Sequence, residues 1–134
     1  MKFDPDSGYE VFRKDGKYLV KEKSGKYKQD SGDRLFDFAT DTFRFLKTLP
    51  AAKEYDDFRY QLSKSATSVG ANYEEAQGAF STKEFTSKIS ICLKEARETN
   101  YFYRLILNLQ IGDAEAGKRL LSESHELKIF LVQS

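Results

Sequence analysis

Residues 58–76 read FRYQLSKSATSVGANYEEA, and this stretch decides the fold. Its apolar and small side chains recur at intervals of three and four residues, which is the spacing of one face of an α-helix. Gly70 lies inside this pattern, where a glycine costs about 1 kcal/mol relative to alanine, so we expect another helix to pack closely against it. The predicted inward stripe consists of Phe58, Leu62, Ser65, Ala66, Val69, Tyr73 and Ala76.

The same periodicity extends along the chain on both sides of this stretch. We expect four helices, over about 32–49, 53–80, 81–111 and 114–132. The first has an inward stripe of Leu35, Ala39, Thr42, Phe43, Leu46 and Leu49, widened by Phe36, Phe38 and Phe45. The third carries Phe85, Ile89, Cys92, Leu93, Ala96, Tyr103, Ile106 and Leu107, and the fourth carries Leu120, Leu121, Ser124, Leu127 and Leu131.

Short breaks separate these helices. Ser81 and Glu84 have the spacing of a capping box, Pro50 follows the first helix, and Gly112-Asp113 ends the third. Short connections imply antiparallel neighbours, so the fold class is all-α, an antiparallel up-down four-helix bundle over residues 33–134. Ile129 and Phe130 lie outside the inward stripe, as does much of 101–107. This surplus of apolar positions predicts a homo-oligomer.

Residues 1–32 have a different texture and are expected to form an N-terminal extension. Asp15-Gly16 suits a type I′ turn between strands over 9–14 and 17–22, which would place Glu10 opposite Lys21. Ser24-Gly25 offers a second turn. The segment is predicted to be a short β-hairpin extension, and the alternative is a partly disordered, lysine-rich tail.

Composition limits the classes of function. The 134 residues hold 22 Lys and Arg against 21 Asp and Glu, a net charge of +1, whereas nucleic-acid binders usually show a strong basic excess. A basic face would have to emerge from folding or oligomerisation. With one cysteine, no membrane-length apolar run and no signal-like N-terminus, we expect a cytoplasmic protein that does not associate with membranes.

Residues that could carry chemistry are few. His125 is the lone histidine, and Cys92 lies on an inward stripe, so we expect an interfacial or solvent-facing imidazole and a buried, inert thiol. Glu74, Glu75, Glu95 and Glu98 do not form the Glu-x-x-His motif of di-metal bundles. The sequence therefore predicts no enzyme, no catalytic or metal site and no cofactor.

Two runs carry a family resemblance: SATSVGAN at 65–72, followed by Glu75-Ala76, and KEARET at 94–99. They resemble the two signature runs of the four-helix-bundle proteins named for open reading frames in intervening sequences of bacterial 23S ribosomal RNA genes. The resemblance covers about 33–133 and implies a protomer that commonly assembles as a homopentamer. The chain is similar, more distantly, to the accessory proteins of diversity-generating retroelements, which are basic pentamers that bind a reverse transcriptase and nucleic acid.

The signature residues also admit a structural interpretation. Asn72, Glu75, Glu95, Arg97 and Glu98 are placed to form a polar network between helices or subunits. Three functions are weighed: an oligomeric scaffold of unidentified partner, an RNA binder that uses a basic rim, and a carboxylate-metal bundle. The scaffold is favoured. Candidate nucleic-acid contacts are Lys14, Lys17, Lys21, Lys23, Lys26 and Lys28, and the alternative for these lysines is a solvated sheet edge.

Overall fold

The structure, a computed structural model, describes the backbone of residues 9–14, 17–22, 27–28 and 31–132, and side chains over 31–132. Four helices dominate it: α1 (Ser31–Leu46), α2 (Asp56–Gln77), α3 (Thr82–Asn108) and α4 (Ala114–Val132). A short 3-10 helix, η1 (Lys53–Tyr55), precedes α2. The prediction of four helices is confirmed.

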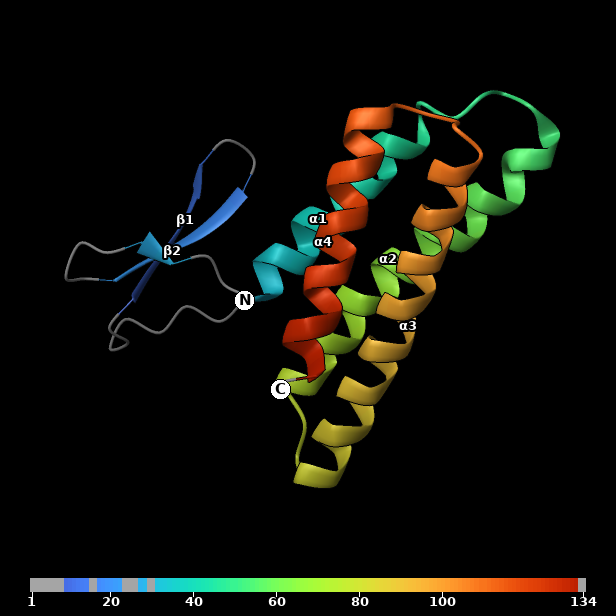
Figure 1. Ribbon diagram of the computed structural model, residues 1–134. Coiled ribbons are helices and arrows are strands. Elements are labelled where there is room, and N and C mark those ends of the chain that lie inside the picture. The colour runs from blue at the N-terminus through green and yellow to red at the C-terminus, as the bar shows by residue number, and fades with distance from the viewer. Residues whose placement is uncertain (1–8, 15–16, 23–26, 29–30, 133–134) are drawn as a thin grey trace.

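The helices pack as a bundle in which each contacts two neighbours. The contacting pairs are α1 with α2, α2 with α3, α3 with α4, and α4 with α1, and sequential helices run in opposite directions (Figure 1). Short connections produce this arrangement, because a helix joined by a tight turn folds back along its predecessor. Of the four faces that these pairs form, α1–α2 and α3–α4 lie opposite each other and share no helix.

Three strands precede the bundle. They are β1 (Tyr9–Lys14), β2 (Lys17–Glu22) and β3 (Tyr27–Lys28). The backbones of β1 and β2 pair antiparallel, with Glu10 opposite Lys21. The predicted turns, Asp15-Gly16 and Ser24-Gly25, lie outside the described residues, and a hairpin extension that forms a separate unit stays a prediction.

The core is organised around Tyr103 of α3, which is fully buried. Its ring contacts Phe38 and Phe45 of α1, with centroids 6.1 Å and 5.5 Å away, and its hydroxyl lies 2.7 Å from Thr42 Oγ1. Burial raises the pKa of this phenol, although the hydrogen bond with Thr42 opposes that shift. Aromatic packing with one internal hydrogen bond thus joins α1 to α3 across the bundle.

The predicted inward stripe of α1 is confirmed at Leu35, Thr42, Leu46 and Leu49, but the phenylalanines were assigned wrongly. Phe38 and Phe45, assigned to the margin, are buried at 2% exposure, whereas Phe43, assigned to the stripe, is 50% exposed. Four phenylalanines within ten residues make several stripes equally apolar, and the contacts with Tyr103 select the one that is buried. As a result Phe43 and Phe36 face outward.

Two predicted helix-end signals are confirmed, although α1, α2 and α3 each end about three residues earlier than expected. Ser81 caps α3 by accepting a hydrogen bond from the Glu84 backbone N–H at 3.0 Å, and the Glu84 carboxylate accepts one from the Phe80 N–H at 3.0 Å. Gly112 adopts a positive φ of 77°, and a Cβ there would lie 3.0 Å from the Phe45 ring. Gly112 therefore allows the close α3–α4 turn that the sequence predicted.

Candidate binding grooves

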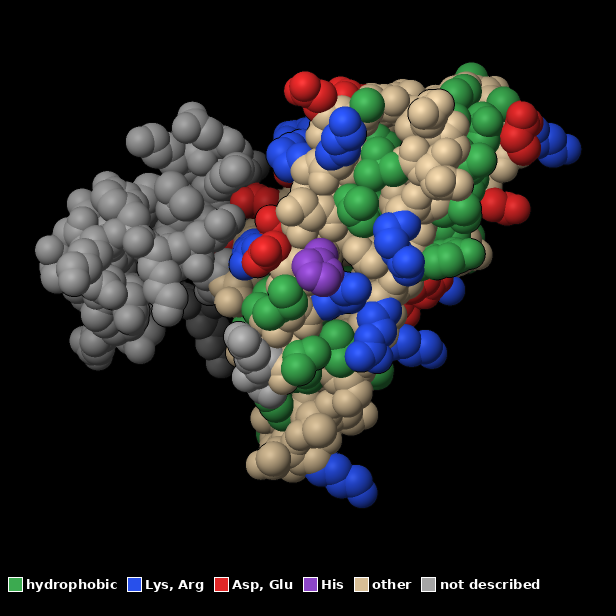
Figure 2. Space-filling model, viewed as in Figure 1, with side chains coloured by type: hydrophobic (Ala, Val, Ile, Leu, Met, Phe, Trp, Pro, Cys, Tyr) green, Lys and Arg blue, Asp and Glu red, His purple; other side chains and the backbone are tan. Residues whose placement is uncertain are grey.

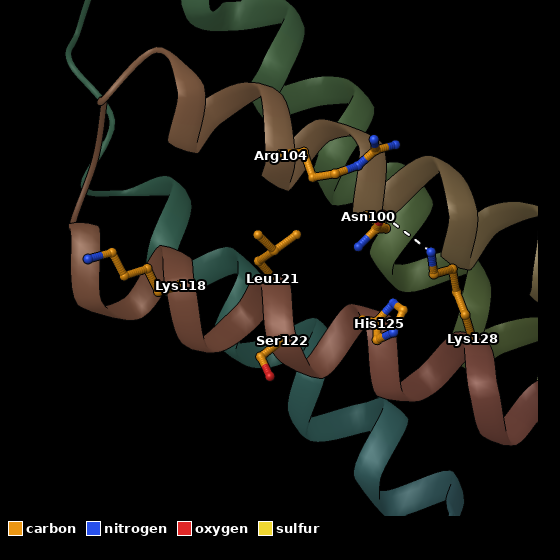
Figure 3. Close-up of a pocket in the computed structure, with 7 residues that line it drawn as sticks. All are labelled: Asn100, Arg104, Lys118, Leu121, Ser122, His125 and Lys128. Atoms are coloured by element: carbon orange, nitrogen blue, oxygen red, sulfur yellow. Dashed lines mark hydrogen bonds between the residues drawn. The ribbon is translucent and has the colours of Figure 1, made fainter.

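A groove of about 620 Å³ runs between α3 and α4. The residues that line it come from one side of each helix, so the close antiparallel packing of the pair brings together residues distant in sequence (Figure 3). The lining consists of Asn100, Arg104, Lys118, Leu121, Ser122, His125 and Lys128.

This groove is basic, although the chain as a whole is nearly neutral. Its lining includes Arg104, Lys118 and Lys128 and contains no carboxylate. Figure 2 shows Lys and Arg side chains below and to the right of the purple His125, with acidic side chains on its left. Glu123 of α4 lies on the other side of its helix, where its Oε1 accepts a hydrogen bond from Arg34 Nε at 2.6 Å. The carboxylate of Glu123 is thus paired with Arg34 of α1 and does not lie in the groove.

A buried amide holds one of the groove cations. Asn100 is 5% exposed, and its Oδ1 accepts a hydrogen bond from Lys128 Nζ at 3.4 Å (Figure 3). The Asn100 Nδ2 donates to Ser124 Oγ at 3.0 Å, and Ser124 in turn donates to the Leu121 carbonyl at 2.7 Å. These bonds fix the amide, which accepts a hydrogen bond from the Lys128 ammonium at one end of the groove.

An aromatic side chain flanks the groove on α3. The Arg104 guanidinium carbon lies 5.7 Å from the centroid of the Tyr101 ring, a distance typical of a cation–π contact. Tyr101 is 52% exposed. A planar cation and an aromatic face are therefore available side by side at the edge of the basic groove.

A second groove, of about 360 Å³, lies between α1 and α2 and is mainly apolar. Its floor is made of small residues, because a Cβ added at Gly70 would lie 3.6 Å from the Leu35 Cβ and Ala71 lies beside it. Phe36 and Phe43, which are 53% and 50% exposed, form its α1 wall, and Glu74 is the one charged residue in the lining.

Of the five residues proposed for a polar network, the two on α2 have partners on different helices. Asn72 Nδ2 donates to the Ser68 carbonyl on its own helix at 2.8 Å, whereas Glu75 accepts from Lys88 Nζ on α3 at 2.6 Å. This ion pair raises the pKa of Lys88.

The α3 members of the set lie further along the bundle. Burial, followed by the repulsion of nearby Glu98, raises the pKa of Glu95, and Arg97 is exposed. The hydrogen-bonded ion pair of Glu75 with Lys88 joins α2 to α3, and Lys64 of α2 lies near enough to Glu95 to oppose the rise in its pKa. An interface role for Glu95, Arg97 and Glu98 stays a prediction.

Sequence reasoning placed Ser65 and Ser124 on the inward stripes but missed their buried partners on α3, Thr99 and Asn100. Thr99 Oγ1 donates to Ser65 Oγ at 2.9 Å, and Asn100 pairs with Ser124 as described above. Thr99 and Asn100 lie three and four residues after Ala96 on the inward stripe of α3, so their spacing was the available signal.

The remaining predictions concern the cysteine, a metal site, a membrane span and the N-terminal lysines. Burial raises the pKa of the Cys92 thiol to about 11, which keeps it protonated near neutral pH. Among residues 31–132 no three His, Cys, Asp or Glu side chains come together as a metal-binding group. The helices that the structure describes are too short or too polar to cross a membrane. The side chains of Lys14, Lys17, Lys21, Lys23, Lys26 and Lys28 lie outside the described residues.

Together these features define a small four-helix-bundle protein whose described residues form an apolar groove between α1 and α2 and a basic groove between α3 and α4. A family model for the 23S rRNA-intervening sequence protein matches residues 28–133. The chain belongs to this family, as the runs at 65–72 and 94–99 had indicated.

One solved structure supports the same assignment. It is a protein of unknown function from the S23 ribosomal protein family of Bacteroides thetaiotaomicron VPI-5482, 30% identical in sequence. The alignment covers 76% of this chain and 94% of that one, with a TM-score of 0.70. A comparison with curated proteins gives no match.

Proposed function

We propose that this chain is a non-enzymatic scaffold protein of the cytoplasm that assembles into a homo-oligomer through its α1–α2 groove. The single observation that carries the proposal is the pair of half-exposed phenylalanines, Phe36 and Phe43, above a floor of small residues. Apolar surface of this kind on a small protein marks an interaction site.

The occupant that we propose is a second copy of the chain. The protomer exposes further apolar side chains on a different helix, Ile129 and Val132 of α4, which are 45% and 65% exposed. A molecule with two unlike apolar surfaces associates head to tail, and such contacts form a closed ring when the rotation between subunits is suitable. The family resemblance supports five subunits, and Glu95, Arg97 and Glu98 are candidates for polar contacts between them.

A matched pair of substitutions tests this proposal. Phe43→Ser removes apolar surface from the groove, whereas Phe80→Ser removes the same side chain from a position that is 98% exposed between α2 and α3. Light scattering after size exclusion should give an oligomer of the 15.4 kDa chain for the wild type and Phe80→Ser, and a smaller species for Phe43→Ser. A wild type that runs as a monomer, or an unchanged mass for Phe43→Ser, would contradict the proposal.

The second candidate function is RNA or other nucleic-acid binding through a basic rim of the oligomer. The observation that favours it is the absence of carboxylates from the lining of the α3–α4 groove. The lysines of residues 1–32, proposed as a hairpin extension, are the other candidate contacts, as the distant similarity to nucleic-acid-binding accessory proteins also suggests. Fluorescence anisotropy with a labelled RNA across a salt series tests this function, and no binding at low salt would exclude it.

A further inference from the structure

We propose that the α3–α4 groove is a binding site for the phosphate backbone of a single-stranded nucleic acid. This inference rests on the second candidate function and assigns it to a defined part of the molecule. It begins from the charges: Arg104 on α3 faces Lys118 and Lys128 on α4 across a groove lined without carboxylates. Such a cluster attracts polyanions and releases their counterions on binding.

The shape of the site suits an extended chain. Lys118 and Lys128 lie ten residues apart on α4, which places them about 15 Å apart along the helix. Arg104 lies on the opposite wall. The groove therefore offers cations along its length, as a backbone with successive phosphates requires, and Ser122 and His125 add polar groups between them.

The restraint on Lys128 distinguishes this groove from a general scatter of surface lysines. Its ammonium donates one hydrogen bond to buried Asn100, so the side chain is held before a ligand arrives. An ammonium has three N–H groups, and two are left for phosphate oxygens. Restraining the side chain in advance lowers the entropy lost on binding.

The aromatic edge favours a nucleic acid over an acidic peptide. Tyr101, half-exposed and in contact with the Arg104 guanidinium, offers a flat surface for a base whose phosphates lie in the groove. Stacking on aromatic side chains beside a cationic channel is the usual way in which proteins bind single strands without sequence preference.

The test uses the full chain and a fluorescein-labelled oligouridylate, with affinity measured by anisotropy across a salt series. The variant R104Q/K118Q/K128Q removes one arginine and two lysines from the groove. The control R44Q/K47Q/K53Q removes the same residue types from exposed positions on α1, in the turn that follows it and on η1. Glutamine at position 128 retains a hydrogen-bond donor for Asn100, and circular dichroism verifies that both proteins are folded.

We expect the groove variant to bind oligouridylate at least about tenfold more weakly than the wild type at moderate salt. Its log–log salt slope should fall in magnitude by about 2, because each phosphate contact to a single strand contributes about 0.7. The control should bind as the wild type does. Replacing the six N-terminal lysines by glutamine in the full chain should affect binding less than the groove variant.

The outcomes separate this inference from the function on which it rests. Wild-type binding that the groove variant retains would overturn the groove assignment and leave nucleic-acid binding intact. A wild type that does not bind oligouridylate at low salt would overturn both. Competition by polyglutamate as effective as that by unlabelled oligouridylate would also overturn the inference, because the groove would then select charge alone, as an acidic-peptide site would.

Discussion

The α1–α2 and α3–α4 grooves are built alike and lined in opposite ways. Each lies between two adjacent antiparallel helices, yet one has Phe36 and Phe43 above small residues and the other has Arg104, Lys118 and Lys128. Both grooves lie over the same hydrophobic core. Their linings differ at exposed positions, where packing in the core does not dictate the residue type. A four-helix bundle can thus carry two separate binding surfaces, and substitutions on one should leave the other intact.

The largest loss of stability is expected for a substitution at Tyr103, in the core beneath both grooves. Tyr103→Ala removes a fully buried ring and should lower the free energy of unfolding by about 4 kcal/mol, with loss of both assembly and RNA binding. Tyr101→Ala removes the same side chain two residues earlier, where it is 52% exposed, and should change stability by at most about 0.5 kcal/mol. Urea unfolding of both variants measures the difference, and equal losses would contradict the assigned burial.

A charge placed in the apolar groove should disrupt assembly and leave RNA binding in the basic groove intact. Ala71→Arg puts a cation on the groove floor, at an exposed position that a good helix former occupies without loss of helix. We expect the oligomer to dissociate while the far-ultraviolet circular dichroism is unchanged. Ala51→Arg, in the exposed turn before η1, is the control and should retain the wild-type mass. Dissociation of both variants would show a general effect of charge.

In the basic groove, buried Asn100 holds Lys128 by a hydrogen bond, and its replacement should have a smaller effect on RNA affinity. Asn100→Leu removes the hydrogen bonds to Ser124 and Lys128 and should cost about 1–2 kcal/mol. Oligouridylate affinity should fall several-fold at constant oligomer mass, because Lys128 is no longer held. Asn108→Leu, at an exposed position of the same helix, should change neither property. Wild-type affinity for Asn100→Leu would remove Asn100 as a positioning residue.

The smallest effect concerns Glu95, which lies in neither groove lining. Its pKa in the folded protein is raised above the ordinary 4.5 by burial and by Glu98, so the folded state holds a proton that the unfolded state releases first. Stability therefore falls as pH rises from about 4.5 through the raised pKa.

Glu95→Gln should accordingly melt slightly higher than the wild type at pH 7, with the difference vanishing below pH 4. Glu126→Gln, at an exposed position of α4, is the control, and thermal melts across pH measure both. A lower melting temperature or a smaller mass for Glu95→Gln at pH 7 would instead place Glu95 against a cation of a neighbouring subunit.

Much of the fold was readable from local spacing, and the grooves were less so. The stripe of α2 was predicted well because small residues on one side leave a single apolar face from Leu62 to Ala76. In α1 the periodicity was ambiguous, since its phenylalanines satisfy several rotations and only contacts with Tyr103 decide among them.

The basic groove could not be read from the sequence for a different reason. It combines Arg104 with Lys118 and Lys128 from another helix, and Glu123 of α4 lies outside the groove lining, where it pairs with Arg34 of α1. The net charge of the whole chain is +1, and this value does not reveal that basic side chains gather in one groove. Contacts between helices, and not local composition, create it.

Light scattering of the full chain with and without saturating oligouridylate tests the central claim, that the two grooves are separate sites. We predict an oligomer whose protein mass is unchanged by the RNA, with the RNA mass added to it. A protein that is monomeric at 15.4 kDa, or an oligomer that the RNA dissociates, would contradict the account, since the latter result means that assembly and RNA compete for one surface.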